Sequence, residues 1–318
     1  MQRRHLLGRA TALAAAGSWA HSALAQKFPS KPITLVVPFA PGGNLDVVAR
    51  TLAPALERTL GQSVIVDNRA GAGGSIGAAF VARADPDGHI VLITTPNAIT
   101  VLPQMVKMPY RLDSFQPVGL AATTSLVVVA KGDDSRFPDI AALLSRARAN
   151  PNNVSVGHAG PGTTNHIAIL QLEEAARITL NPVPYKGSAP ALTDLLGGQI
   201  DFVVDQLTSS APHIRSGALR ALAVMSRDRD PALPKVPTLR EAGLTDFDAT
   251  TATGLLTPTG TPPENVRLLN AVLRKALDDD IVKSRLLAVG SVARASSVEE
   301  WRSLLQQEAD RTTKLAQA

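Results

Sequence analysis

The residues best suited to hold a ligand come in short segments that directly follow apolar runs. In the first, Pro41-Gly42-Gly43-Asn44 follows the apolar residues 33–39. The two glycines would let a ligand approach the backbone, and a helix beginning here would offer free N–H groups that favour a carboxylate or a phosphate. An ordinary tight turn, with Asn44 as the N-cap of the next helix, explains the same residues equally well.

A glycine-rich segment at residues 71–77 has a pattern found in esterases. Gly73 to Gly77 matches G-x-S-x-G, which would make Ser75 a nucleophile. That chemistry needs the serine on a sharp turn directly after a strand, whereas residues 67–74 separate Ser75 from the preceding apolar run. A helix cap is therefore the favoured role of Ser75, and an esterase is retained as an alternative. The segment is no P-loop, because no lysine follows it.

Two threonines and two histidines surround a third segment, residues 160–162. The hydroxyls of Thr163 and Thr164 could donate hydrogen bonds to a carboxylate, or they could cap a helix that begins here. His158 and His166 could bind a metal or act as a base, but their spacing of eight residues fits no recognised ligand pattern. A position at the surface or the edge of a pocket is favoured for both, and no metal site is predicted.

Two further candidates stand at the ends of apolar runs. The hydroxyl of Tyr185 could reach a ligand, although a half-buried strand tyrosine is the plainer interpretation. Asp205 follows the apolar residues 202–204, where a carboxylate could bind an amine, a hydroxyl or a water molecule of the ligand, or could cap the next helix. The sequence predicts no catalytic residue and no cofactor.

The elements that position these segments follow from the hydrophobic periodicity. Short apolar runs predict strands near residues 33–39, 64–66, 90–94, 126–129, 154–156, 178–185, 202–204 and 219–224. Helical spacing predicts helices near residues 44–60, 75–83, 138–149, 163–176 and 188–196, with a kink at Pro54. Capping-box patterns at Thr261 with Glu264 and at Ser297 with Glu300 predict two C-terminal helices. Strands that alternate with helices predict two α/β domains whose ligands lie at the carboxyl ends of the strands.

The composition excludes several classes of protein. The chain has 318 residues, of which 45% are hydrophobic and 19% charged, as in globular proteins. It contains no cysteine, which excludes disulfides, thiolate metal sites and cysteine nucleophiles. Residues 26–318 carry 29 Lys and Arg against 27 Asp and Glu, and no basic stripe is present, so we expect no nucleic-acid partner.

Residues 1–25 have the pattern of an export signal. Arg3, Arg4 and His5 precede a mostly apolar stretch of small residues, and Ala23-Leu24-Ala25 is an A-x-A cleavage site. The paired arginines fit a twin-arginine signal as well as an ordinary secretion signal. We expect cleavage after Ala25 and a location in a bacterial periplasm.

Two longer stretches resemble a known family. Residues 31–43, KPITLVVPFAPGG, are similar to the opening strand and loop of the substrate-binding proteins of tripartite tricarboxylate transporters, often called the Bug family. Residues 183–198, VPYKGSAPALTDLLGG, are nearly the pattern of that family and are highly specific. Residues 68–74, 218–224 and 236–238 add to the resemblance, which runs from about Phe28 to the C-terminal helix.

The resemblance implies a type II-like periplasmic binding protein of two α/β lobes, each a mostly parallel sheet flanked by helices, with a hinge between the lobes. Lobe 1 would comprise residues 26–122 and 229–318, and lobe 2 residues 123–228. The loop at residues 41–46 would hold a carboxylate through backbone N–H groups and ordered water. The ligand-binding residues expected in all are Phe39, Ala40, Pro41, Gly42, Gly43, Asn44, Asp46, Thr95, Asn97, Gly162, Thr163, Thr164, His166, Tyr185 and Asp205.

We therefore predict a monomeric receptor that captures a small organic acid between two lobes and delivers it to subunits of a tripartite tricarboxylate-type membrane transporter. It would catalyse no reaction. An esterase that uses Ser75, or a sensor that feeds a signalling receptor, are the alternatives. Residues 250–253 read Thr-Thr-Ala-Thr where the family often has aromatic residues near the cleft, so the resemblance does not specify the ligand.

Overall fold

The computed structural model describes residues 28–244 and 247–317, and of residues 311–317 it describes the backbone. Its strands are β1 (Ile33–Val37), β2 (Val64–Asn68), β3 (Ile90–Thr94), β4 (Phe115–Lys131), β5 (Ser155–His158), β6 (Asn181–Pro184), β7 (Phe202–Gln206), β8 (Leu219–Val224), β9 (Thr250–Pro258) and β10 (Ser291–Ala293). Its helices are α1 (Asn44–Leu60), α2 (Ser75–Ala82), α3 (Asn97–Thr100), α4 (Leu102–Met105), α5 (Ile140–Ala149), α6 (Thr164–Ala176), α7 (Ser188–Leu196), α8 (Leu207–Arg215), α9 (Pro263–Asp278), α10 (Asp280–Leu287) and α11 (Val298–Gln317). Short 3-10 turns cover Ala72–Gly74 and Leu112–Ser114. The predicted export signal lies outside the described residues. None of the described helices has both the length and the apolar character that crossing a bilayer requires.

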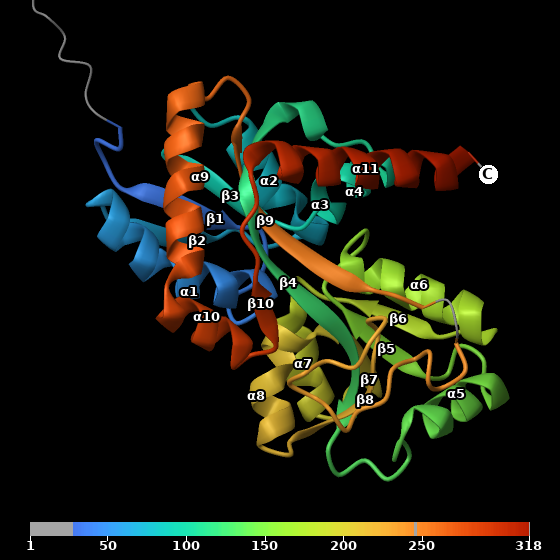
Figure 1. Cartoon of the computed structure of the whole chain (residues 1–318). Helices are drawn as coiled ribbons and strands as arrows, with labels where there is room; N and C mark the ends of the chain where they lie inside the picture. Colours follow the sequence, from blue (N-terminus) through green and yellow to red (C-terminus); the bar gives the residue numbers. More distant parts are fainter. Residues whose placement is uncertain (1–27, 245–246, 318) are drawn as a thin grey trace, which may run out of the picture.

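The strands form two lobes that share β4 (Figure 1). The sheet order is β2-β1-β3-β9-β4-β7-β5-β6, and β8 and β10 pair with β4 outside this path. Strand β4 pairs with β9 up to Ser125, in lobe 1, and from Leu126 onward it pairs with β7 and β8, in lobe 2. The predicted two-lobed α/β class is confirmed. Pairing is parallel in β2-β1-β3 and in β6-β5-β7, and it is antiparallel where β4 and β9 run between the lobes.

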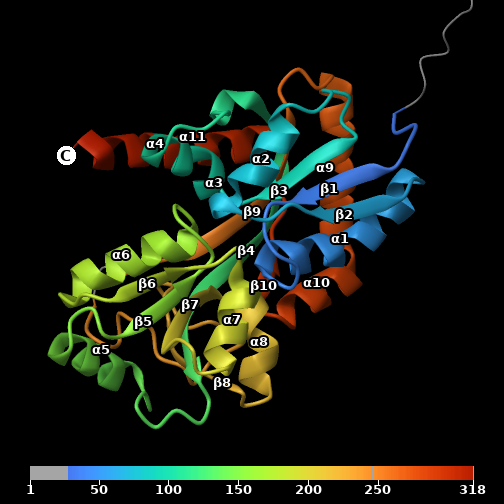
Figure 2. The same ribbon diagram turned by 180° about the vertical axis from the view of Figure 1, so that it is seen from behind.

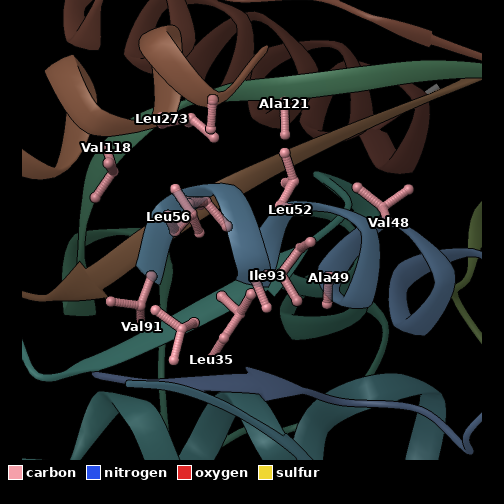
Figure 3. Close-up of a cluster of buried hydrophobic side chains, with 14 of the residues drawn as sticks. Leu35, Val48, Ala49, Leu52, Leu56, Val91, Ile93, Val118, Ala121 and Leu273 are labelled. Carbon is pink, nitrogen blue, oxygen red and sulfur yellow. The ribbon is translucent and has the colours of Figure 1, made fainter. Parts of the chain in front are cut away.

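Each lobe buries apolar side chains on both faces of its sheet. In lobe 1, Leu52 and Leu56 of α1 pack with Leu35 and Ile93 of the sheet, as Figure 3 shows. Helices α9 and α10 belong to the same cluster, whereas Trp301 of α11 covers the opposite face together with α2. Burial of one such leucine contributes about 1.5–3 kcal/mol. These cores hold the strand ends, and thus the loops between the lobes, in fixed positions.

The chain returns to lobe 1 along a second crossing beside β4. Leu239, Phe247 and Ala249 pack in the apolar cluster of lobe 2, and the Leu126 N–H donates to the Ala249 carbonyl (3.4 Å). Strand β9 then begins at Thr250 beside the lobe 1 part of β4. The lobe boundaries expected from the sequence, near Ala122 and Asp228, remain predictions. These contacts concern the second boundary, because residues beyond Asp228 still pack in lobe 2.

The starts of the helices differ partly from the sequence prediction. Ser297 and Glu300 form the predicted capping box, with Ser297 N–H donating to Glu300 Oε2 (2.6 Å) and Glu300 N–H to Ser297 Oγ (3.0 Å). The box predicted at Thr261 is wrong, because its hydroxyl donates to the Pro258 carbonyl (2.8 Å) instead. The prediction that Asn44 caps α1 is also wrong. Gly43 is the N-cap residue, and the Asn44 amide donates to Thr253 Oγ1 of β9 (3.4 Å).

Candidate functional site

A small cavity lies where the two lobes meet, at the carboxyl ends of β1, β3, β5 and β7. Its volume is about 20 Å³, which is room for about one water molecule. Every side chain that lines it is uncharged. The lining residues are Phe39, Gly43, Asn44, Leu45, Thr95, Ala159, Thr163, Thr164, Asn165, Ser188 and Gln206.

Three helices have their first residue in the cavity lining, one from lobe 1 and two from lobe 2. Figure 2 shows these helices, α1 in one lobe and α6 and α7 in the other. Helix α1 starts at Asn44, α6 at Thr164 after its N-cap Thr163, and α7 at Ser188. The first N–H groups of a helix have no partner within the helix, and the positive end of its dipole favours an anion by about 0.3–1 kcal/mol. An anion between the lobes would therefore be stabilised from both sides without a cationic side chain.

The loop before α1 is held by the carboxylate of Asp46, which accepts several hydrogen bonds. Asp46 Oδ2 accepts hydrogen bonds from Gly42 N–H (2.9 Å) and Arg50 Nε (3.0 Å), and Oδ1 accepts one from Asn68 Nδ2 (2.9 Å). Asn68 Nδ2 also donates to the Phe39 carbonyl (3.1 Å). Burial raises the pKa of Asp46, but the hydrogen bonds that it accepts outweigh burial and bring the pKa below its ordinary value. Asp46 thus fixes the loop and is absent from the cavity lining.

The remaining residues of the predicted first-loop site divide into two groups. Phe39, Gly43 and Asn44 line the cavity, whereas Ala40, Pro41 and Gly42 do not. The Ala40 N–H is used by a contact between the lobes, since it donates to the Lys186 carbonyl (3.1 Å). The Gly42 N–H is held by Asp46, as described above. The N–H groups left for a ligand are those at the first turn of α1.

The lobe 2 wall is an ordered set of neutral polar side chains. Gln206 Nε2 donates to Asn165 Oδ1 (3.0 Å), and Asn165 Nδ2 donates to Gln206 Oε1 (3.2 Å) and to the Val204 carbonyl (2.8 Å). Ser188 Oγ also donates to Gln206 Oε1 (3.2 Å). Sequence reasoning missed these lining residues. Only their positions in the chain could have indicated them, because Gln206 ends a strand and Asn165 and Ser188 lie in the first turn of a helix.

Asp205 and Tyr185 are not part of the cavity lining. The Asp205 carboxyl is fully buried, its Oδ2 accepts from Ser209 Oγ (2.7 Å), and its Oδ1 has no partner among the described residues. Burial raises the pKa of Asp205 to about 6. The Tyr185 hydroxyl donates to Asp194 Oδ2 (2.7 Å), and burial together with that carboxylate raises its pKa to about 12. Their roles as ligand contacts remain predictions.

The two histidines support the loop at the start of α6. Their rings stack with centroids 4.7 Å apart, and His166 Nδ1 accepts from the Gly162 N–H (3.2 Å). Burial lowers the pKa of both and brings that of His158 to about 4, so neutral rings are favoured at pH 7. Neither ring, nor Gly162, lines the cavity. Within the described residues, no three His, Asp or Glu side chains lie where they could hold a metal ion.

Thr95 and Thr164 complete the cavity lining on its two sides. Thr164 Oγ1 of lobe 2 donates to Asn97 Oδ1 of lobe 1 (3.2 Å), so this pair is a direct bond between the lobes. Asn97 does not line the cavity itself.

Ser75 is the first residue of α2 and is 8% exposed. It does not line the cavity, and no described hydrogen bond joins its hydroxyl to a histidine. This arrangement lacks the paired base that an activated serine requires.

Comparison with known proteins identifies the family to which the chain belongs. The sequence profile of the tripartite tricarboxylate transporter family receptors matches residues 48–318. A curated relative from Pseudomonas sp. (strain P51), the UPF0065 protein in the tcbD-tcbE intergenic region, is 42% identical over 316 residues, which are 99% of this chain and 93% of the relative.

Two solved structures share the fold. The periplasmic binding protein BugD is 36% identical and superposes with a TM-score of 0.86 over 91% of this chain and 97% of that chain. MatC from Rhodopseudomonas palustris, solved with bound malate, is 35% identical with a TM-score of 0.85 over 90% of this chain and 98% of that chain.

The predicted resemblance to the Bug family is confirmed, and neither alternative function gains support from these proteins. The chain belongs to the tripartite tricarboxylate transporter receptor family.

Proposed function

We propose that this receptor binds a small organic carboxylate in the cavity between its lobes. The observation that carries the proposal is the convergence of three helix starts, α1, α6 and α7, on a cavity lined by uncharged side chains. Such a site offers N–H and O–H donors to an anion and presents no carboxylate that would repel it. Malate in the related MatC structure supports this ligand class.

The energetics suit reversible capture. A hydrogen bond to a charged group contributes about 1.5–3 kcal/mol, and micromolar binding requires about −8 kcal/mol. A few bonds from backbone N–H groups at the starts of α1, α6 and α7 to one carboxylate would supply much of this, after part is lost to ordering the ligand and the lobes. Neutral donors also avoid the burial of an unpaired cationic side chain before the ligand arrives.

Binding must involve movement of the lobes, because about 20 Å³ cannot contain an organic acid. Across the cleft the Ala40 N–H and the Thr164 hydroxyl already bond to the opposite lobe. The described arrangement is therefore a closed one, and a ligand enters when the lobes part. Closure around the ligand would then select the loaded receptor for the transporter.

The receptor would act in the periplasm as a monomer, exported by the twin-arginine or the general secretion route and cleaved after Ala25. Its partners would be the organic acid and subunits of a tripartite tricarboxylate-type transporter. We draw the lobe boundaries at Ser125 and Ala249, because β4 changes partners after Ser125 and Ala249 still packs in the lobe 2 cluster.

The test is isothermal titration calorimetry with malate on Gly43→Val. Gly43 has an ordinary φ of −81°, and the nearest atom to an added Cβ is 3.6 Å away, so the variant should fold. Its side chain would occupy the cavity and abolish binding. Gly197→Val is the matched control, because Gly197 also has an ordinary φ, −73°, and is exposed away from the cleft. Unchanged malate binding by the Gly43 variant would refute the assignment.

A further inference from the structure

A cluster of buried hydroxyl and amide side chains lies where β4 passes from one lobe to the other. Its central residue is Thr124, which is 2% exposed and stands just before the point, after Ser125, where β4 changes partners. The Thr124 hydroxyl lies within hydrogen-bonding distance of Asn44 Oδ1 (3.4 Å), Thr208 Oγ1 (3.2 Å) and Ser291 Oγ (3.0 Å). Thr124 therefore joins α1, α8 and β10 at the strand that both lobes share.

The partners of the Thr124 hydroxyl determine the direction in which it donates. A hydroxyl has one hydrogen to donate and can accept two hydrogen bonds. The Oδ1 of Asn44 can only accept, so the hydrogen of Thr124 goes to Asn44. The hydroxyls of Thr208 and Ser291 must then donate to Thr124, and they fill its two acceptor positions. With all three bonds made, the Thr124 hydroxyl is fully used and its donor direction is fixed.

The same cluster sets the orientation of the Asn44 amide. Its Oδ1 accepts from Thr124, and its Nδ2 donates to Thr253 Oγ1 (3.4 Å). An amide nitrogen carries two hydrogens, and no described residue accepts the second one. Asn44 is 4% exposed and lines the cavity between the lobes. A ligand carboxylate in that cavity would supply the missing acceptor.

We propose that Thr124 is a positioning residue for ligand binding, which orients the Asn44 amide so that its second N–H donates to the carboxylate of the ligand. Without the Thr124 hydroxyl, the amide would be free to turn and to present its oxygen to the anion, which that oxygen would repel. Thr208 belongs to lobe 2, so a residue of one lobe helps to set a donor of the other. This inference rests on the proposed function, since it requires a carboxylate in the cavity.

The experiment is calorimetry with malate on Thr124→Val, which keeps the shape of threonine and removes the hydroxyl. Loss of the orienting bond should weaken malate binding by about threefold to tenfold, a modest change that fits bonds as long as 3.4 Å. Thr124→Ser keeps the hydroxyl and should restore the affinity. Thr251→Val is the matched control and should leave the affinity unchanged, because Thr251 lies opposite Thr124 in β9, is 1% exposed and has no described partner for its hydroxyl.

A double-mutant cycle with Asn44→Ala shows whether Thr124 acts through Asn44. Asn44→Ala removes the amide and should itself weaken malate binding. If Thr124 acts through that amide, Thr124→Val should cause no further loss in the Asn44→Ala background. A general structural role would instead give the same loss in both backgrounds.

A second variant keeps the test valid if Thr124→Val folds poorly. Thr124→Val combined with Thr208→Val replaces both hydroxyls of one hydrogen bond by apolar groups of the same shape, which leaves fewer unpaired groups in the cluster. The combined variant still lacks the donor to Asn44, so the same weakening of malate binding is expected.

The possible results separate the two proposals. Weaker malate binding that serine restores, and that disappears in the Asn44→Ala background, supports the role of Thr124. Unchanged affinity in the valine variants at Thr124, equal losses in both backgrounds, or an equal loss in Thr251→Val overturns it. If the unaltered protein binds no malate, the proposed carboxylate function itself fails, and the role of Thr124 fails with it.

Discussion

Gly73 lies so close to the opposite lobe that the closed arrangement leaves no room for a side chain at this position. Gly73 lies in the 3-10 turn before α2, with a φ of +63°, and it faces the loop before α6 in the opposite lobe. A Cβ added there would lie 2.2 Å from the Pro161 carbonyl oxygen, which is backbone and cannot rotate aside. We predict that Gly73→Ala holds the lobes apart and weakens binding of malate.

The size of the effect follows from that distance. Ordinary contact begins near 3.4 Å, so the lobes must part by about 1.2 Å at this point. A similar displacement would stretch the Ala40–Lys186 and Thr164–Asn97 bonds, now 3.1 Å and 3.2 Å long, beyond hydrogen-bonding range. Loss of both bonds, at about 1–1.5 kcal/mol each, corresponds to roughly thirtyfold to hundredfold weaker binding.

Gly61→Ala separates this effect from backbone strain. Gly61 ends α1 with a φ of +67° and has no atom within 4 Å of an added Cβ. Both variants should lose about 1 kcal/mol of unfolding free energy in urea, because alanine disfavours a positive φ. Only Gly73→Ala should lose affinity for malate in calorimetry, and it alone should show a larger radius of gyration in X-ray scattering. Equal affinities in the two variants would refute the role of this contact.

Three further predictions concern buried ionisable groups. Asp46→Asn should lower the unfolding free energy by about 1–3 kcal/mol, because the loop before α1 loses the carboxylate that anchors it. The same change should lower the affinity for malate, and calorimetry that finds an unaltered affinity would contradict this. His158 has its pKa lowered to about 4 from an ordinary 6.5, so the unfolded chain binds more protons between these values, and stability should fall as the pH drops from 6.5 to 4. In urea unfolding, the free energy of unfolding of His158→Phe should depend less on pH between 4 and 6.5 than that of the unaltered protein. An unchanged pH dependence would contradict this prediction. Asp205 acts in the opposite sense: its pKa is raised from 3.8 to about 6, so stability should fall as the pH rises through this range, and Asp205→Asn should remove that fall.

The local features that could be predicted from sequence are those set by neighbouring residues. Helix α7 begins at Ser188 and ends at Leu196, as predicted, because glycines flank an amphipathic run. Thr163 caps α6, with its Oγ1 accepting from the His166 N–H (3.4 Å), as the hydroxyl at that position indicated. The seventeen-residue strand β4 was predicted only in its second half, since its first half carries small and polar residues without an apolar run. Strand β9 was missed for the same reason.

The site was harder to predict because its side chains choose partners that are distant in sequence. Asn44 has the ordinary chemistry of an N-cap, but Thr253 and Thr124 of the crossing strands lie within reach of its amide. Asp46 sits in the predicted loop, yet its carboxylate accepts hydrogen bonds from Asn68 and Arg50 and is absent from the cavity lining. The strand-end rule located the loops, whereas only the packing of the two lobes decides which atoms of those loops face the cavity.

A crystal structure of the protein grown with malate tests the central claim most directly. We predict that one malate carboxylate lies between the lobes, with its oxygens about 2.7–3.2 Å from backbone N–H or hydroxyl groups at the starts of α1 and α6, next to Gly43 and Thr163. Malate bound elsewhere, or held there mainly by a lysine or arginine side chain, would contradict the claim that neutral donors at helix starts bind the anion.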